Sequence, residues 1–222
     1  MIVTLEKHND VGVILIDDGN KNVINHQVLD ELEPAFAEAE RDTKAIVISG
    51  RPGSFCAGYD ISVMTGDDPG AASELGLRGG KFAHQLYSSK NPLLAVSTGH
   101  AFTIGAIWLA CCDIRIGEKG NYKYCMSEVK LGVPFGAWPL QPLKARLSPA
   151  HQIEALLHSK PYPPEEAVAA GYIDQLTEPG AGLAVAIDKA KVLARLPQSA
   201  YAKSKLQLRE EALSVMAADL GL

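Results

Sequence analysis

The sequence predicts an α/β protein built around a buried parallel sheet. Two segments, KAIVISG (44–50) and LLAVSTG (93–99), are continuously apolar, as expected for strands that are buried on both faces. Each is followed by a glycine-containing loop and then by a segment with helical periodicity. Strands that alternate with helices in this way are typical of right-handed βαβ units.

The remaining elements follow from the same kind of pattern. Residues 2–19 predict two short strands around the turn HND, and residues 20–42 change to a helical period with apolar side chains at Val28, Leu29, Leu32 and Phe36. The polar, Gly-rich segment 62–80 predicts a short helix and a flexible loop. Further expected elements are a helix over 80–90, a strand at 114–117 and a helix-turn-strand unit over 167–176.

The C-terminal part is predicted to be mostly helical, with two helices interrupted at Pro197. No linker or internal repeat divides the chain. We therefore expect one structural unit, in which residues 1–180 form the core and residues 181–222 form helices that cover the core or mediate assembly.

Composition and charge exclude several classes of function. The chain has 222 residues, of which 47% are hydrophobic and 21% charged, as is ordinary for a globular protein with a sizeable core. A net charge of -5 without a basic cluster argues against nucleic acid as a partner. The longest apolar segment, AFTIGAIWLACC, is shorter than the roughly 20 residues needed to span a bilayer, so no membrane association is expected.

The cysteines and the N-terminal segment point to a reducing compartment. The four cysteines lack the C-x-x-C spacing of a zinc site and suggest no disulfide framework. The N-terminal segment MIVTLEKHND is charged and leads directly into an expected strand, unlike a secretory signal. We therefore expect a cytoplasmic location.

Two glycine-containing loops are the first candidates for a functional site. RPGSFCAGYDI (51–61) and GHAFTIGAIWLACCD (99–113) each follow a predicted buried strand. The first N–H groups of the apolar helix in the second loop lack intrahelical partners and carry partial positive charge. Two such loops could direct two N–H donors at one oxygen, as an oxyanion hole does. Taken alone, the first loop is explained equally well as a tight turn with an Asp cap.

The same segments resemble a known family. SFCAGYDI, GHAFTIGAIWLACCDIRIG and MSEVKLGVP are similar, in this order, to three motifs of the crotonase (enoyl-CoA hydratase/isomerase) superfamily. The resemblance covers essentially the whole chain. It implies an α/β fold with a crotonase-like ββα spiral core and a helical C-terminal assembly region, which forms a homotrimer or a dimer of trimers.

The resemblance also implies a substrate and its contacts. Crotonases bind acyl-CoA thioesters and stabilise an enolate-like oxygen with two backbone N–H groups, which here fall on Tyr59 and Ile104. Ile104 stands where the family usually has glycine, and the neighbouring Gly105 is an alternative donor. Coenzyme A enters as part of the substrate, and neither a permanent cofactor nor a metal is implied. The expected contacts of the substrate are Asn22, Val23, Ala57, Asp60 and Ile61, with Ile107 and Phe135 beside the acyl group. Lys203 and Lys205 on the terminal helix would either meet phosphates or form a solvated face.

The carboxylates suggest which reaction is catalysed. Family hydratases use two glutamates, and the matching positions here are Ile107 and Glu128. A single carboxylate suits moving a proton from C2 to C4 of one substrate. The pattern therefore resembles the enoyl-CoA isomerases, with Glu128 as proton carrier and a pKa raised by apolar neighbours. The alternatives are an enoyl-CoA hydratase or another crotonase lyase or hydrolase, and a non-catalytic acyl-CoA-binding protein of the same fold.

Overall fold

The computed structural model describes residues 1–222, apart from the side chain of Pro69, as a mixed α/β structure with two sheets. The larger sheet has the order β1-β2-β3-β5-β7-β9, and the smaller one has the order β4-β6-β8. The strands of the larger sheet are β1 (Val3–His8), β2 (Val11–Ile16), β3 (Ala45–Ser49), β5 (Leu93–Ser97), β7 (Ile114–Glu118) and β9 (Gln175–Thr177). Those of the smaller sheet are β4 (Gly53–Cys56), β6 (Gly99–Phe102) and β8 (Tyr124–Cys125).

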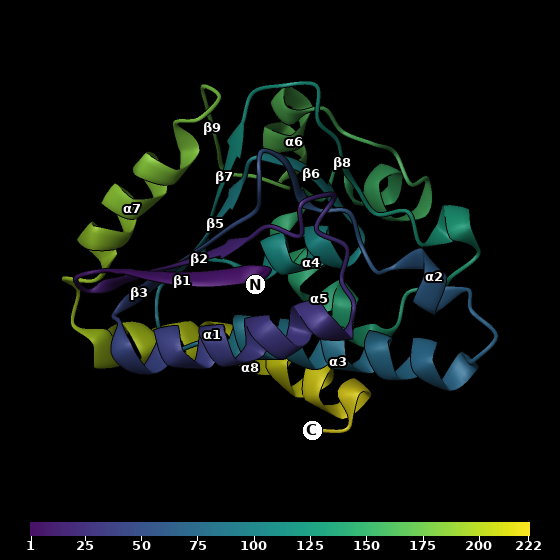
Figure 1. Cartoon of the computed structure of the whole chain (residues 1–222), viewed down its shortest axis with the longest axis horizontal. Coiled ribbons are helices and arrows are strands. Elements are labelled where there is room, and N and C mark those ends of the chain that lie inside the picture. The colour runs from purple at the N-terminus through teal and green to yellow at the C-terminus, as the bar shows by residue number, and fades with distance from the viewer.

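The helices surround these sheets (Figure 1). They are α1 (His26–Asp42), α2 (Ile61–Met64), α3 (Pro69–Ser88), α4 (Ile104–Cys111), α5 (Ala137–Arg146), α6 (Pro164–Ala170), α7 (Gly182–Leu193) and α8 (Gln198–Leu220), with short helical turns η1 (Val129–Leu131) and η2 (Ile153–Leu157). None of these described helices combines the length and the apolar character that a membrane crossing requires.

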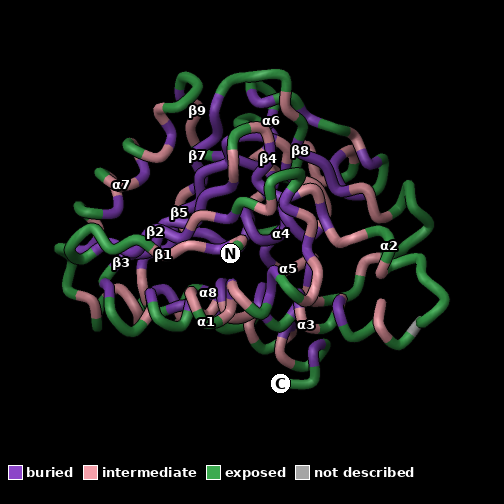
Figure 2. The backbone as a smooth tube through the Cα atoms, viewed as in Figure 1, coloured by how far each residue is buried: buried purple, intermediate pink, exposed green. Residues whose placement is uncertain are grey.

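Alternation along the strands of the larger sheet divides the core into two layers. In β2, Val11 and Val13 pack in a cluster with the alanines of α7, whereas Ile14 and Ile16 face the cluster that includes α1 and α4. The strands from β2 to β9 are parallel, and β1 is antiparallel to β2. Figure 2 shows the resulting burial, with the strands of the sheet and α4 inside and the outer loops exposed. The predicted buried parallel sheet is thereby confirmed.

The C-terminal helices pack on two different parts of this core. α7 covers one face of the larger sheet (Figure 1), and α8 packs against α3 and α5. The predicted interruption at Pro197 is confirmed, because Pro197 immediately precedes the first turn of α8.

Three local predictions are wrong. Residues 69–80 form the first half of α3 instead of a flexible loop, because tertiary packing uses their glycines: a Cβ at Gly80 would lie 2.7 Å from Leu220 Cδ2. The turn expected between Gly99 and Gly105 contains β6, which pairs with β4 and β8. Likewise, residues 53–56 of the first loop form β4.

Candidate active site

The smaller sheet brings three chain segments to one edge. β4, β6 and β8 are parallel neighbours, so the segments that follow them leave the sheet on the same side. Tyr59 follows β4, Ile104 follows β6 and Glu128 follows β8. The carboxyl ends of parallel strands are the usual location of ligand sites in α/β proteins.

The first segment is held by the chain that precedes α1. Ile24 N–H donates to Gly58 O at 2.8 Å, and Asp60 N–H donates to Ile24 O at 2.9 Å. Gly58 itself has a φ of 101°, which an L-residue rarely adopts. Within the described chain the intervening Tyr59 N–H has no hydrogen-bond partner. The loop is therefore fixed on both sides of one free donor.

The side chain of Asn22 holds this segment in place. Its fully buried side chain donates to Ile16 O at 2.7 Å and to Ser54 O and Phe55 O at 3.2 Å, and accepts from Asp18 N–H at 3.0 Å. The side chain is thus committed to the protein, and only the backbone of Asn22 is left to meet a ligand.

Some groups of the other expected substrate contacts are free to bind a ligand, and others are already hydrogen-bonded within the protein. Val23 N–H donates to Asp18 Oδ2 at 3.1 Å, so only the carbonyl of its backbone could serve. Asp60 caps α2 by accepting from Ser62 N–H at 2.9 Å, so the Asp cap considered for this loop is present. Ile61 is 74% exposed at the start of α2.

The second segment turns sharply before α4. Thr103 has a φ of 47° and a ψ of -119°, a conformation that is strained for a residue other than glycine. This turn presents the N–H groups of Ile104 and Gly105, which open the helix and have no intrahelical partners. A Cβ at Gly105 would lie 2.6 Å from Cys56 Cβ, so glycine is required where α4 meets β4.

The first two segments contact each other. A Cβ at Gly58 would overlap Thr103 Oγ1, so the loop that carries the Tyr59 N–H lies directly against the turn that carries the Ile104 N–H. Thr103 N–H also donates to Cys125 O at 3.0 Å, which ties this turn to the end of β8. The three segments form one contiguous unit.

Glu128 has the properties of a proton carrier. Its Oε2 atom is buried and has no hydrogen-bond partner among the described groups, and no ion pair to Lys130 forms. Burial raises the pKa of the carboxyl group from 4.5 to about 7. A carboxyl group with such a pKa can both accept and donate a proton near neutral pH.

The charge of Glu128 contributes to the pKa of two tyrosines. Burial is the main cause that raises the pKa of Tyr59 and of Tyr172, and the carboxylate of Glu128 contributes to both shifts. Tyr172 packs beside Tyr124 of β8, with ring centroids 6.1 Å apart. The sequence analysis did not single out Tyr172, because it lies on a different element and only the fold brings it to β8.

Apolar residues surround this edge of the sheet. Ile107 is buried on α4, and Phe135 packs against the same core cluster, as do Ile104 and Trp108. The raised pKa of Glu128 agrees with the desolvation expected from such neighbours. The thiols of Cys56, Cys111 and Cys112 are poor candidates for nucleophiles at this site. Burial raises the pKa of Cys56 to about 12 and also raises the pKa of Cys111 and Cys112.

The pKa of Glu128 predicts a pH dependence of stability. Because the folded-state pKa of about 7 lies above the unfolded value near 4.5, the folded state binds more protons between these values. The contribution of Glu128 to the free energy of unfolding should therefore fall as the pH rises from about 4.5 to 7. Urea unfolding of the wild type and of Glu128→Gln would test this, with the variant gaining relative stability over this range. A constant difference between the two proteins would contradict it.

Comparison with known proteins gives the site its context. Residues 6–220 match the family described as enoyl-CoA hydratase/isomerase. The chain is 28% identical over 181 residues to the short-chain-enoyl-CoA hydratase of Clostridium acetobutylicum, which covers 80% of this chain and 69% of that protein.

Solved structures are similar over the full length. The enoyl-CoA hydratase EchA3 from Mycobacterium ulcerans has a TM-score of 0.95 at 32% identity, covering 100% of this chain and 97% of that one. A Mycobacterium tuberculosis protein, named enoyl-CoA isomerase in one structure and probable enoyl-CoA hydratase EchA3 in another, has in the first a TM-score of 0.94 at 30% identity, covering 99% of this chain and 96% of that one. These matches confirm the predicted crotonase fold, while the names of the relatives include both hydratases and isomerases. The chain therefore belongs to the enoyl-CoA hydratase/isomerase family of acyl-CoA-acting crotonases.

Proposed function

We propose that this protein is an enoyl-CoA isomerase that shifts a double bond from C3 to C2 of an acyl-CoA thioester. The observation that supports the proposal is that a single carboxyl group, Glu128, follows β8 at the same edge of the smaller sheet as the segments that carry the free N–H groups of Tyr59 and Ile104. Position 107, where family hydratases have their second glutamate, is a buried isoleucine that cannot transfer a proton.

In the proposed mechanism the thioester oxygen lies between the N–H groups of Tyr59 and Ile104. Glu128 removes a proton from C2, and the negative charge of the resulting dienolate develops on that oxygen. The same carboxyl group then returns the proton to C4. A pKa of about 7 supports this cycle, because neither protonation state of Glu128 is strongly favoured at neutral pH.

In this mechanism the backbone N–H groups stabilise the negative charge that develops on the thioester oxygen. They are fixed before substrate arrives, because Gly58 and Thr103 hold the two segments in contact. The removal of one such donor typically raises the barrier by about 2.7–4 kcal/mol. Gly105 N–H, one position further along α4, is the alternative second donor.

The substrate would bring coenzyme A as part of the thioester. We expect coenzyme A to contact Ala57, the backbone of Asn22, the carbonyl of Val23, and Asp60 and Ile61 at the start of α2. No permanent cofactor is required for proton transfer by Glu128, and no group of three or more potential metal-ligating side chains occurs among the described residues.

Two other functions have specific support. An enoyl-CoA hydratase, or another crotonase lyase or hydrolase, is favoured by the names of relatives such as the Clostridium acetobutylicum hydratase. A non-catalytic acyl-CoA-binding protein is favoured by the presence of Ile104 and Ile107 in place of the family's glycine and glutamate.

The test is a comparison of products from 3-enoyl-CoA and 2-enoyl-CoA in separate incubations. We expect 3-enoyl-CoA to give the 2-enoyl isomer and 2-enoyl-CoA to give little 3-hydroxyacyl-CoA, because no second carboxylate holds a water. Ile107→Glu should add weak hydration, whereas Ile107→Gln, a matched neutral control, should not. Dominant hydration by the wild type would support the hydratase. Binding of acyl-CoA without any turnover would support the non-catalytic protein.

We also propose that the protein assembles as a homotrimer or a dimer of trimers, as its family resemblance implies. Val192 on α7 is 63% exposed, which supports further burial of this helix. Light scattering should give about three or six times the monomer mass of 23.7 kDa. A monomer at micromolar concentration would overturn this proposal.

A further inference from the structure

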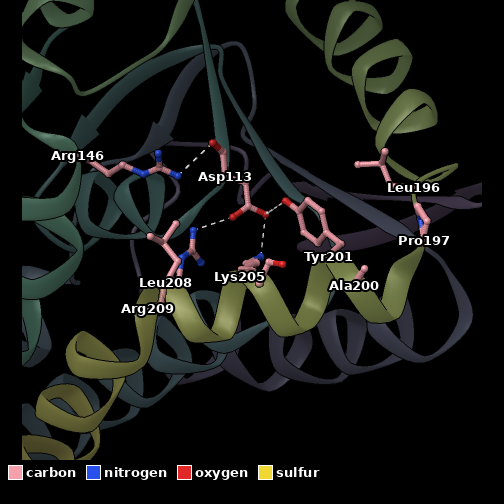
Figure 3. Close-up of a pocket in the computed structure, with 10 residues that line it drawn as sticks. Asp113, Arg146, Leu196, Pro197, Ala200, Tyr201, Lys205, Leu208 and Arg209 are labelled. Atoms are coloured by element: carbon pink, nitrogen blue, oxygen red, sulfur yellow. Dashed lines mark hydrogen bonds and ion pairs between the residues drawn. The ribbon is translucent and has the colours of Figure 1, made fainter.

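An ionic cluster joins the residue that follows the end of α4, Asp113, to side chains of α8, and Figure 3 shows these side chains around Asp113. Asp113 is its centre: Oδ1 accepts from Arg209 Nη2 at 2.7 Å, and Oδ2 accepts from Lys205 Nζ at 2.7 Å and from Tyr201 Oη at 3.0 Å. Leu93 N–H donates to Oδ2 at 2.8 Å. Lys205 therefore cannot meet coenzyme A phosphates, and its expected alternative role on a solvated face is wrong as well, since it is only 7% exposed.

A third cation joins this cluster. Arg146 from α5 donates through Nη2 to Cys112 O at 2.6 Å and to Asp113 O at 3.1 Å. Within the described structure it has no carboxylate partner, and its Nε and Nη1 groups make no hydrogen bond to the protein. The neighbouring Arg115 does not change the net charge of the cluster, because its charge is paired with that of Asp174.

The cluster is therefore short of negative charge. Arg146, Lys205 and Arg209 face the single carboxylate of Asp113. Arg209 Nη1 also donates to carbonyls at the C-terminal ends of α3 and α4, at 2.7 Å and 3.3 Å. Each helix end is equivalent to roughly half a negative charge, so the two ends offset about one of the two surplus positive charges. About one positive charge is left without a counterpart.

Titration behaviour agrees with this count. Burial lowers the pKa of Arg146, and the neighbouring charges of Arg115 and Arg209 lower it further, while Asp174 and Asp113 oppose the shift. Burial likewise lowers the pKa of Lys205 although Asp113 opposes the shift. Both cations would be stabilised by an added anion.

The cluster opens onto a cavity of about 480 Å³, a size suited to a small organic molecule. One part of its wall is the ionic cluster, with Arg146, Tyr201, Lys205 and Arg209 visible around Asp113 in Figure 3. The rest is mostly apolar and comes from the start of α8 and the residues before it. It consists of Leu196, Pro197, Ala200, Ser204 and Leu208.

We propose that this cavity binds a small organic carboxylate with a short hydrocarbon tail. The carboxylate group would accept hydrogen bonds from Arg146 and supply the missing negative charge, since guanidinium groups suit carboxylates in geometry and are weakly hydrated. The tail would lie against Leu196, Ala200 and Leu208. The apolar wall disfavours a strongly hydrated ion such as inorganic phosphate. Apart from Asp113, the last residue of segment 99–113, none of the lining residues belongs to the segments that carry Tyr59, Ile104 or Glu128. The proposal does not depend on the proposed function.

The test compares hexanoate with 1-hexanol, which has the same tail without the charge. Calorimetric titration of the wild type should show hexanoate binding about tenfold more tightly or better, as a charged hydrogen bond provides. Ser204→Phe fills the cavity without removing a charge and should weaken hexanoate binding by a similar factor. Ser199→Phe is the matched control, because Ser199 is also exposed on α8 but does not line the cavity. It should bind hexanoate as the wild type does.

Three results would overturn the proposal. Equal affinities for hexanoate and 1-hexanol would show that charge is not recognised. Unchanged hexanoate binding in Ser204→Phe would place the ligand elsewhere, for example beside Glu128. No hexanoate binding by a protein whose light-scattering mass is a multiple of the monomer's would indicate that a second copy of the chain occupies the cavity.

Discussion

Replacement of Glu128 by glutamine is expected to lower turnover by about 10²–10⁴-fold, the usual contribution of a positioned general acid or base. Glutamine keeps the size of the side chain, so an acyl-CoA thioester should bind with nearly unchanged affinity. Steady-state kinetics with 3-enoyl-CoA would therefore show the loss in kcat more than in KM. In the wild type, kcat should rise with pH up to about 7 and then level off, because only the ionised carboxyl group can remove the C2 proton.

Glu211→Gln provides the control for this experiment, since Glu211 is exposed on α8 and lies far along the chain from the three site segments. It should retain wild-type kinetics and the same pH profile. If Glu128→Gln kept more than about a tenth of wild-type turnover, Glu128 would not be the proton carrier. Because the same substitution is expected to stabilise the fold above neutral pH, lost activity could not be attributed to unfolding.

Gly58→Ala is expected to lower turnover by about 10²–10³-fold, as the loss of one oxyanion donor does. Gly58 has a φ of 101°, and an added Cβ would overlap Thr103 Oγ1. The segment would have to move away from the turn before α4, which would displace the Tyr59 N–H from the shared site. The measurement is kcat/KM with 3-enoyl-CoA, accompanied by thermal unfolding.

Gly53→Ala separates the chemical effect from backbone strain. Gly53 also has a positive φ, 92°, but an added Cβ there meets nothing within 4 Å. Both variants should lose stability, by roughly 1–3 kcal/mol for the strained conformation. Only Gly58→Ala should lose most of its activity. Similar activity in the two variants would mean that the contact with Thr103 does not position the donor.

Most of the larger sheet was predictable because five of its strands have 5 or 6 residues, enough to carry a local signal. KAIVISG and LLAVSTG are apolar throughout since both of their faces are covered, one by the layer that includes α1 and α4 and the other by α7. The smaller sheet was not predictable in this way. β8 has only 2 residues, and β4 and β6 have 4 each, too few to show a period. Their pairing depends on segments that are distant in sequence.

The candidate site, too, could be predicted from the sequence only in part. Glu128, Tyr59 and Ile104 could be proposed because motif resemblance supplies long-range information that composition and periodicity lack. The buried side chain of Asn22, which holds the chain beneath Tyr59, was expected only as a backbone contact. The partners of Asp113 could not be foreseen, because Lys205 and Arg209 reach it from 92 and 96 positions away. Nothing in the local sequence distinguishes these two cations from solvated ones.

The same separation affects the order of events during synthesis. Asp113 emerges from the ribosome well before Tyr201, Lys205 and Arg209, which supply three of its hydrogen bonds. Until they arrive, the carboxylate of Asp113 at the end of an apolar helix lacks its two ion-pair partners, Lys205 and Arg209, and a carboxylate without such partners opposes burial. The last helix also closes over α3 and α5, both made earlier. A nascent chain that ends before residue 201 therefore contains every strand of both sheets and all three site segments, yet it lacks the three side chains that stabilise the carboxylate of Asp113.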